Sequence, residues 1–297
     1  MHKILISVLW LALICSFGFA QEASQNSINL IVTDKENNFV GDMKKEEIAL
    51  FIDGKEHSNF LIDKQTSPLI YVLAVDSSGS MRSIFGDILN SAKIMVSQNN
   101  QNDLTLLMRF ISSDKIQVTD KFSSDEKYLH SNLNLFAVEG GQTAVIDAIF
   151  KSVQTVAEQE GVGEDYRRSV VVVSDGEDRD SLNTQEQLIK LLQKEKVQIF
   201  FIGLINELDK EGGFISKSPR EKSKKFIQKI TEASGGAAIY PKKIEQLPEI
   251  AKQIISLLRT QYILKFQLPD NIKKSAKIEI RSAKSSKRKN LNFHFRR

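Results

Sequence analysis

Residues 71–81 read Tyr-Val-Leu-Ala-Val-Asp-Ser-Ser-Gly-Ser-Met, an apolar run that stops at an aspartate and turns through two spaced serines. The apolar part, residues 71–75, has the composition and length of a strand buried on both faces of a sheet. Asp76, Ser78 and Ser80 then place three oxygen-bearing side chains, the ligand type that hard divalent cations prefer, on one tight turn. Open α/β folds bind ligands at the carboxyl ends of their strands, so this turn is a candidate binding site.

Two further loops carry similar side chains. A second apolar run of buried type, residues 169–174, ends in Asp175-Gly176. Between the two runs, the sequence Gly140-Gly141-Gln142-Thr143 opens a predicted helix. If both runs are strands of one parallel sheet, the three loops meet at its carboxyl edge. Two aspartates and three hydroxyls supply enough oxygen for a divalent cation. The alternative is that they are ordinary turn residues, since Asp and Ser are common in turns.

These residues also carry a family resemblance. Asp76-x-Ser78-x-Ser80, Thr143 and the Asp175 of Ser-Asp-Gly-Glu-Asp resemble the metal-ion-dependent adhesion site (MIDAS) of von Willebrand factor type A domains. The resemblance implies that Ser78, Ser80 and Thr143 bind the ion directly, while Asp76 and Asp175 bind directly or through water. It implies Mg²⁺ or Mn²⁺ in preference to Ca²⁺, and one open coordination position that a partner protein's Asp or Glu fills. The lack of His and Cys ligands argues against zinc or copper.

Three nearby acids have less specific roles. Asp147 lies one helical turn after Thr143. It is either an acceptor that holds the Thr143 loop from behind the ligands, or an acid that favours the positive end of a helix dipole. Glu177 and Asp178 follow the site aspartate and are predicted to be solvated loop acids.

Catalysis is not expected at these loops. A serine nucleophile needs a neighbouring base, and none of the four histidines follows a sheet strand at its carboxyl end: His2, His57, His130 and His294. A phosphatase built on Asp76 would need a second aspartate at position 78, which is serine. The chain also lacks the G-x-x-x-x-G-K-[ST] motif of nucleotide phosphate sites. We therefore expect that the protein is not an enzyme.

The first twenty residues predict a signal peptide. Lys3 gives a positive start, residues 4–14 form an apolar stretch, and Gly18-Phe19-Ala20 is a small-x-small cleavage site. Cleavage after Ala20 would remove Cys15, the single cysteine of the chain. The alternative is a retained signal anchor, although the stretch is shorter than the roughly 20 apolar residues of a membrane span. We expect an exported protein that is periplasmic, at the cell surface or secreted, with no transmembrane span in the mature chain.

The remaining chain predicts an α/β domain between two β segments. Residues 21–67 alternate like strands, residues 68–260 alternate strands with helices, and residues 261–297 return to strands. The middle part predicts a doubly wound, mostly parallel sheet of six strands with about six helices on both faces. Neither β segment has enough apolar residues for its own core, so residues 261–297 should pair with residues 27–66 in one small accessory β unit.

The charge of the chain is uneven. The net charge is +4 at pH 7, and residues 270–297 hold ten Lys or Arg against two Asp or Glu. The basic tail either forms a patch for an anionic polymer or supplies the solvated face and turn of a terminal hairpin.

The expected function is metal-ion-dependent protein binding by an exported protein, in adhesion or complex assembly. One alternative is a structural or envelope-assembly component that docks without metal. Another is a binder of anionic polymer through the basic tail. A nucleic-acid partner is not expected, and the sequence predicts no oligomeric state.

Overall fold

The structure is a computed structural model that describes residues 25–206, 219–268 and 276–296. The predicted signal peptide, residues 1–20, therefore lies outside the described residues. Within the described parts of the chain, no helix has the length and apolar character needed to cross a membrane.

A six-stranded sheet forms the centre of the larger domain, in the strand order β10-β9-β8-β5-β6-β7. Five strands are parallel, and the edge strand β7 runs antiparallel to β6. The strands are β5 (Leu69–Asp76), β6 (Leu104–Phe110), β7 (Ile116–Val118), β8 (Arg167–Ser174), β9 (Gln198–Gly203) and β10 (Ala238–Ile239). All eight residues of β5 are buried, as its unbroken apolar run predicts.

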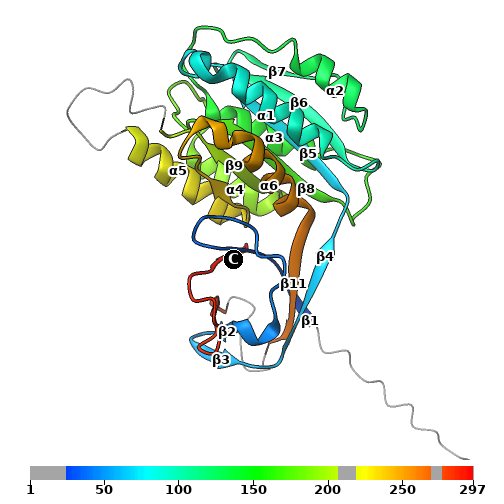
Figure 1. Cartoon of the computed structure of the whole chain (residues 1–297), viewed down its shortest axis with the longest axis vertical. Helices are drawn as coiled ribbons and strands as arrows, with labels where there is room; N and C mark the ends of the chain where they lie inside the picture. The colour runs from blue at the N-terminus through cyan, green and yellow to red at the C-terminus, as the bar shows by residue number, and fades with distance from the viewer. Residues whose placement is uncertain (1–24, 207–218, 269–275, 297) are drawn as a thin grey trace, which may run out of the picture.

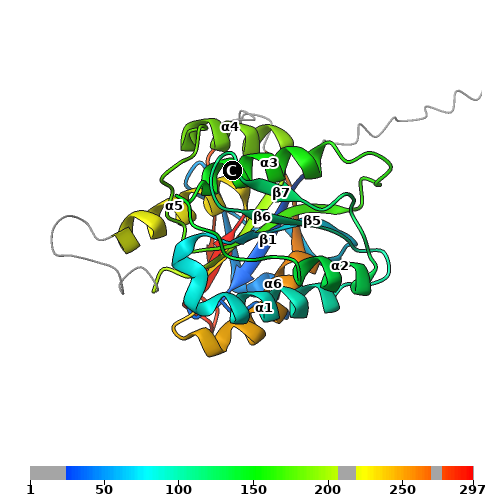
Figure 2. The same ribbon diagram turned by 90° about the horizontal axis from the view of Figure 1, so that it is seen from above.

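Helices cover both faces of this sheet, so the predicted doubly wound fold is confirmed (Figures 1 and 2). One face is covered by α1 (Phe85–Ser97), α2 (Glu126–Leu133) and α6 (Leu247–Arg259). The other face is covered by α3 (Val145–Ala157), α4 (Gln185–Glu195) and α5 (Pro219–Ser234). Short 3₁₀ turns lie at η1 (Lys45–Glu47), η2 (Gly79–Ile84) and η4 (Ile244–Gln246).

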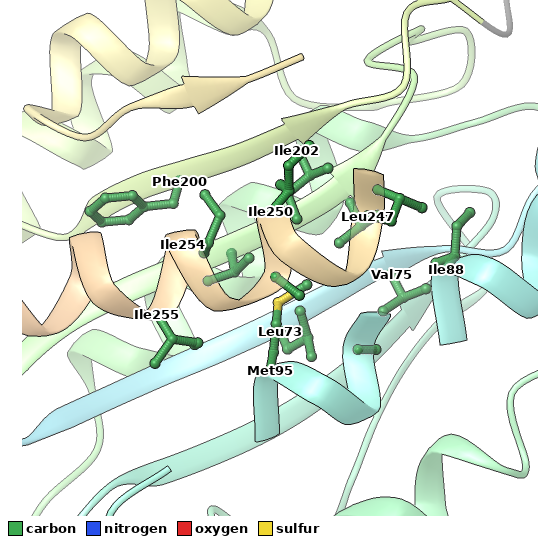
Figure 3. Close-up of a cluster of buried hydrophobic side chains, with 14 of the residues drawn as sticks. Leu73, Val75, Ile88, Met95, Phe200, Ile202, Leu247, Ile250, Ile254 and Ile255 are labelled. Atoms are coloured by element: carbon green, nitrogen blue, oxygen red, sulfur yellow. The ribbon is translucent and has the colours of Figure 1, made fainter. Parts of the chain in front are cut away.

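Alternate residues of each central strand pack into two hydrophobic cores, one on each face of the sheet. Leu73 and Val75 of β5 pack with α1 and α6 (Figure 3), whereas Val72 and Ala74 belong to the core under α3. The α6 residues in the first core recur at helical spacing, as in Leu247, Ile250 and Ile254. This two-sided burial holds the ends of β5 and β8 in fixed positions at the carboxyl edge of the sheet.

The terminal segments pair with each other and form an accessory β unit, as predicted. The unit contains two antiparallel sheets, a division that the sequence did not indicate. Residues of both sheets form a third hydrophobic core. The first, β13-β1-β11-β4, contains β1 (Gln25–Thr33), β4 (Phe60–Thr66), β11 (Thr260–Gln267) and β13 (Asn292–His294). The second, β12-β2-β3, contains β2 (Ile48–Ile52), β3 (Lys55–His57) and β12 (Ile278–Ser282).

The α/β domain is inserted between two neighbouring strands of the accessory unit. Strands β4 and β11 are antiparallel partners, with Thr66 opposite Thr260. The chain leaves β4 for the central sheet and returns through α6, which continues into β11 without an intervening residue. Where the chain leaves and returns, Ser67 N donates to Arg259 O at 3.2 Å.

Candidate metal site

Two adjacent parallel strands place the carboxylates at the centre of the site. Asp76 ends β5 and Asp175 follows the last residue of β8, and these strands are hydrogen-bonded neighbours. Both side chains are removed from solvent, since Asp76 is 0% exposed and Asp175 is 1% exposed. Gly176 then turns the chain with a positive φ of 75°, and Glu177 N donates to Asp175 Oδ1 at 2.9 Å.

The serines of the first loop connect the two carboxylates. Ser78 Oγ and Ser80 Oγ lie 3.2 Å apart, within hydrogen-bond distance. Ser80 Oγ donates to Asp175 Oδ2 at 3.0 Å, and Ser78 N donates to Asp76 Oδ1 at 3.0 Å. The structure therefore brings Asp76, Ser78, Ser80 and Asp175 together in one cluster of oxygen atoms.

The electrostatics of this cluster favour a bound cation. Burial raises the pKa of Asp76, with hydrogen bonds from Ser174 and Ser78 acting in the opposite direction. Burial, and next the negative charge of Asp76, raise the pKa of Asp175 to about 7. Among the described residues, neither carboxylate forms a salt bridge that would balance this charge. A cation between them would offset both the burial and the mutual repulsion.

Thr143 reaches the same edge through its backbone. The Thr143 carbonyl accepts hydrogen bonds from Arg179 N at 2.8 Å and Asp180 N at 3.2 Å, on the loop after Asp175. On the other side, Ala144 N donates to Ile111 O at 3.0 Å, just after β6. The Thr143 side chain is buried. Among the hydrogen bonds of the described chain, none joins its hydroxyl to the two serines or the two aspartates.

Asp147 is buried and contacts the loop after Asp175. Its carboxylate accepts hydrogen bonds from Leu182 N at 2.8 Å, from Asn183 N at 2.9 Å and from Asn183 Nδ2 at 2.8 Å. It also lies in the first turn of α3, as both sequence interpretations assume. Its side chain thus fixes α3 to this loop, while the Thr143 loop is held through backbone contacts.

Asp178 is not the freely solvated acid that the sequence suggested. Its Oδ1 accepts hydrogen bonds from Ile146 N at 3.1 Å and Ser181 Oγ at 2.5 Å, and burial raises its pKa. Asp178 therefore caps the start of α3, immediately after the Thr143 loop.

Two residues with structural roles at the site were missed in the sequence. Ser174 Oγ donates to Asp76 Oδ2 at 2.6 Å and accepts from Gly176 N at 3.0 Å. Arg109, near the end of β6, donates to Ala137 O at 2.9 Å and to Glu139 in the loop that leads to Thr143. Glu139 N in turn donates to Ser77 O at 3.0 Å. The position of Ser174 beside Asp175 was the one available signal, and nothing local marked Arg109.

The donor set fits a hard divalent cation. Two carboxylates and up to three hydroxyls match the oxygen preference of Mg²⁺ and Mn²⁺. In the described part of the chain, no group of three or more His, Cys, Asp or Glu side chains forms a competing metal site.

The fold and the site define an α/β domain with an oxygen-rich cluster at the carboxyl edge of its sheet. The von Willebrand factor type A domain family matches residues 72–253, more than half of the chain, and the protein belongs to this family. No curated protein matches the chain in sequence.

Solved structures are similar to the chain at low sequence identity. A von Willebrand factor type A structure from Catenulispora acidiphila shares the fold, with a TM-score of 0.50 and 12% identity over 89% of this chain and 71% of its own. An aerotolerance-related membrane protein from Bacteroides fragilis NCTC 9343 has a TM-score of 0.47 and 19% identity, covering 63% and 98%. Proximal thread matrix protein 1 from the mussel byssus, with a zinc-occupied MIDAS motif, has a TM-score of 0.49 and 18% identity, covering 68% and 49%.

Proposed function

We propose that this protein is an exported binding protein whose type A domain recognises a partner protein through a divalent cation, Mg²⁺ or Mn²⁺. The ion would lie among Asp76, Ser78, Ser80 and Asp175, with Thr143 as a further ligand. The role would be adhesion or complex assembly.

The observation that carries the proposal is the buried pair of aspartates. Two carboxylates lie at the ends of adjacent strands and have no salt-bridge partner among the described residues. Burial raises the pKa of both, and the charge of Asp76 further raises the pKa of Asp175. A divalent ion balances the two charges and leaves little surplus negative charge. An acidic group of a partner can then complete the coordination shell through a charge-assisted contact.

Binding is favoured over catalysis by the positions of the histidines. His57 lies in β3 and His294 in β13, both in the accessory unit. His130 contacts Ser97 and the carbonyl of Lys93, at the carboxyl end of α1 and so away from the aspartates. The described chain thus offers the two strand-end loops no histidine base.

Isothermal titration calorimetry with MgCl₂ and MnCl₂ tests the metal site. We expect one equivalent to bind to the wild-type protein and none to Asp76→Ala. Asp120→Ala is the matched control, because Asp120 is an exposed acid that follows the antiparallel strand β7. Equal metal affinity in the wild type and Asp76→Ala would rule out the site.

Partner binding is tested separately by capture from a cell-envelope fraction with Mg²⁺ or with EDTA. Proteins captured by the wild type in Mg²⁺, and lost with EDTA or in Asp76→Ala, fit the proposed function. Capture that is unaffected by EDTA and by Asp76→Ala would indicate a component that docks without metal.

A further inference from the structure

A large groove lies between the α/β domain and the accessory unit. It has a volume of about 1240 Å³, and its walls come from α4 and α5 on one side and from β12 and β13 on the other. Figure 1 shows the C-terminal segment lying beneath these two helices. None of the five candidate metal-site residues lines the groove, so it is separate from the metal site.

The groove is bordered by the edge strands of all three sheets. β10 is the last strand of the central sheet, β12 ends the three-stranded sheet and β13 ends the four-stranded sheet. Each contributes lining residues, for example Ala238, Ile280 and Phe293. An edge strand presents unpaired backbone N–H and C=O groups, to which an extended chain can add as a further strand.

The free side of β12 can be assigned from its hydrogen bonds. Asp53 N donates to Lys277 O at 2.9 Å, and Ala283 N donates to Glu47 O at 2.8 Å. Backbone groups alternate in direction along an antiparallel strand, so the odd-numbered residues of β12 bond to β2. The backbone groups of Ile278, Ile280 and Ser282 therefore point away from β2, and no described strand pairs with β12 on that side.

The charge of the groove selects an acidic occupant. Its lining includes five basic side chains, all exposed: Lys224, Lys229, Lys277, Arg281 and Lys289. It includes two acidic side chains, Glu232 and Glu279. Glu279 already forms salt bridges with both Lys277 and Arg281, so the basic charge stays in excess.

The size and the floor of the groove indicate a polypeptide. Its volume exceeds the roughly 300–1,000 Å³ of small-molecule pockets. Tyr240, Leu291 and Phe293 give it apolar surface between the basic side chains. A nucleic acid or lipid headgroup would satisfy the charges but would leave the open strand edges unpaired.

We propose that this groove binds an extended acidic segment of a partner protein, which adds to the free edge of β12 and pairs its carboxylates with the surrounding lysines. This site acts independently of the metal site. An apolar side chain at every second position of the segment would pack on the groove floor, because side chains alternate along a strand.

The test uses an eight-residue fluorescent peptide of alternating Glu and Val, with fluorescence polarisation on the full chain. We expect saturable binding, and no binding of the same peptide with Lys in place of Glu. An N-methylated version that cannot donate backbone hydrogen bonds should bind about tenfold more weakly. Lys224→Glu with Lys229→Glu should also weaken binding about tenfold.

Helix α5 supplies the matched control. Lys222 and Lys225 lie on the same helix but do not line the groove, so Lys222→Glu with Lys225→Glu makes the same charge change elsewhere. Affinity unchanged in this control and in Asp76→Ala, while metal binding is lost in the latter, supports a separate site. Three results would overturn the proposal: no binding, equal affinity for the N-methylated peptide, or sedimentation showing that a second copy of the chain fills the groove.

Discussion

Ser80 Oγ donates a 3.0 Å hydrogen bond to Asp175 Oδ2, joining two loops that are far apart in sequence. This contact forms because β5 and β8 are neighbours in register, with Val75 opposite Val173. A divalent cation between the loops would be held by both of these side chains. The two loops are thus joined directly by a contact between two of the candidate metal ligands.

Ser174→Ala should weaken Mg²⁺ binding about tenfold, because groups that orient a metal ligand are typically worth 10–100-fold in affinity. The change removes the 2.6 Å hydrogen bond to Asp76. Ser169→Ala on the same strand is the control, since the buried Ser169 hydroxyl has no hydrogen-bond partner among the described residues. Calorimetry should separate the two variants, and equal affinities would show that Ser174 does not position Asp76.

Mg²⁺ should stabilise the protein more at pH 8 than at pH 5.5. Burial and the charge of Asp76 raise the pKa of Asp175 from 3.8 to about 7 in the folded protein. Without metal, the free energy of unfolding therefore falls as the pH rises through this range. Metal binds the ionised form and compensates for this loss at high pH only. Melting temperatures with and without Mg²⁺ measure the increment, and an increment independent of pH would contradict the prediction.

Arg109→Gln should loosen the loop that leads to Thr143. The guanidinium holds this loop through Ala137 and Glu139, and it is 7% exposed. We expect faster amide exchange at residues 137–143 and Mg²⁺ affinity reduced several-fold, with the sheet unchanged. Lys115→Ala removes a second, exposed ion pair of the same Glu139 and should have little effect. Similar exchange in the two variants would exclude this role for Arg109.

His294 should make the accessory unit sensitive to acid. Burial lowers its pKa to about 4 from 6.5, and its Nε2 lies 3.0 Å from Thr33 Oγ1. The folded state therefore binds fewer protons than the unfolded state in this window, and stability is lost as pH falls from 6.5 toward 4. The loss should reach about 2–3 kcal/mol at most for this half-buried side chain. Urea unfolding of His294→Gln should show a flatter pH dependence.

Removing residues 276–297 should expose β2 and β3 selectively. β2 would lose its partner β12, while β1 would lose only its short pairing with β13, and both β1 and β4 would keep β11. Hydrogen exchange should accelerate at residues 48–57 and stay slow in the central sheet. Unchanged protection of β2 would mean that β12 contributes little to its stability.

The sequence predicted elements whose signal is local. The runs before Asp76 and Asp175 are apolar throughout and end in turns, so their strands and common edge could be expected. β3 carries no such signal, because Lys-Glu-His has no apolar residue and this strand depends on pairing with β2. α2 buries only Leu129 and Leu133, so the helical repeat of apolar residues in its sequence is weak.

The site shows the same division. Motif spacing predicted the candidate oxygen ligands, but Ser174 and Arg109 contact residues that are distant in sequence and near only after folding. Their roles depend on strand register, which one sequence does not reveal. Likewise, the accessory unit divides into two sheets because β1 pairs with β11 and β13, whereas β2 pairs with β12.

The opposition of Thr66 and Thr260 has a consequence for the order of folding. Residues 67–259 form the connection between the antiparallel partners β4 and β11. If this connection were unfolded, closing it would cost roughly 4 kcal/mol more in chain entropy than closing a two-residue turn. Once the inserted domain has folded, it delivers both ends side by side and removes this penalty. The accessory unit should therefore assemble last, after the folded inserted domain has brought β4 and β11 together.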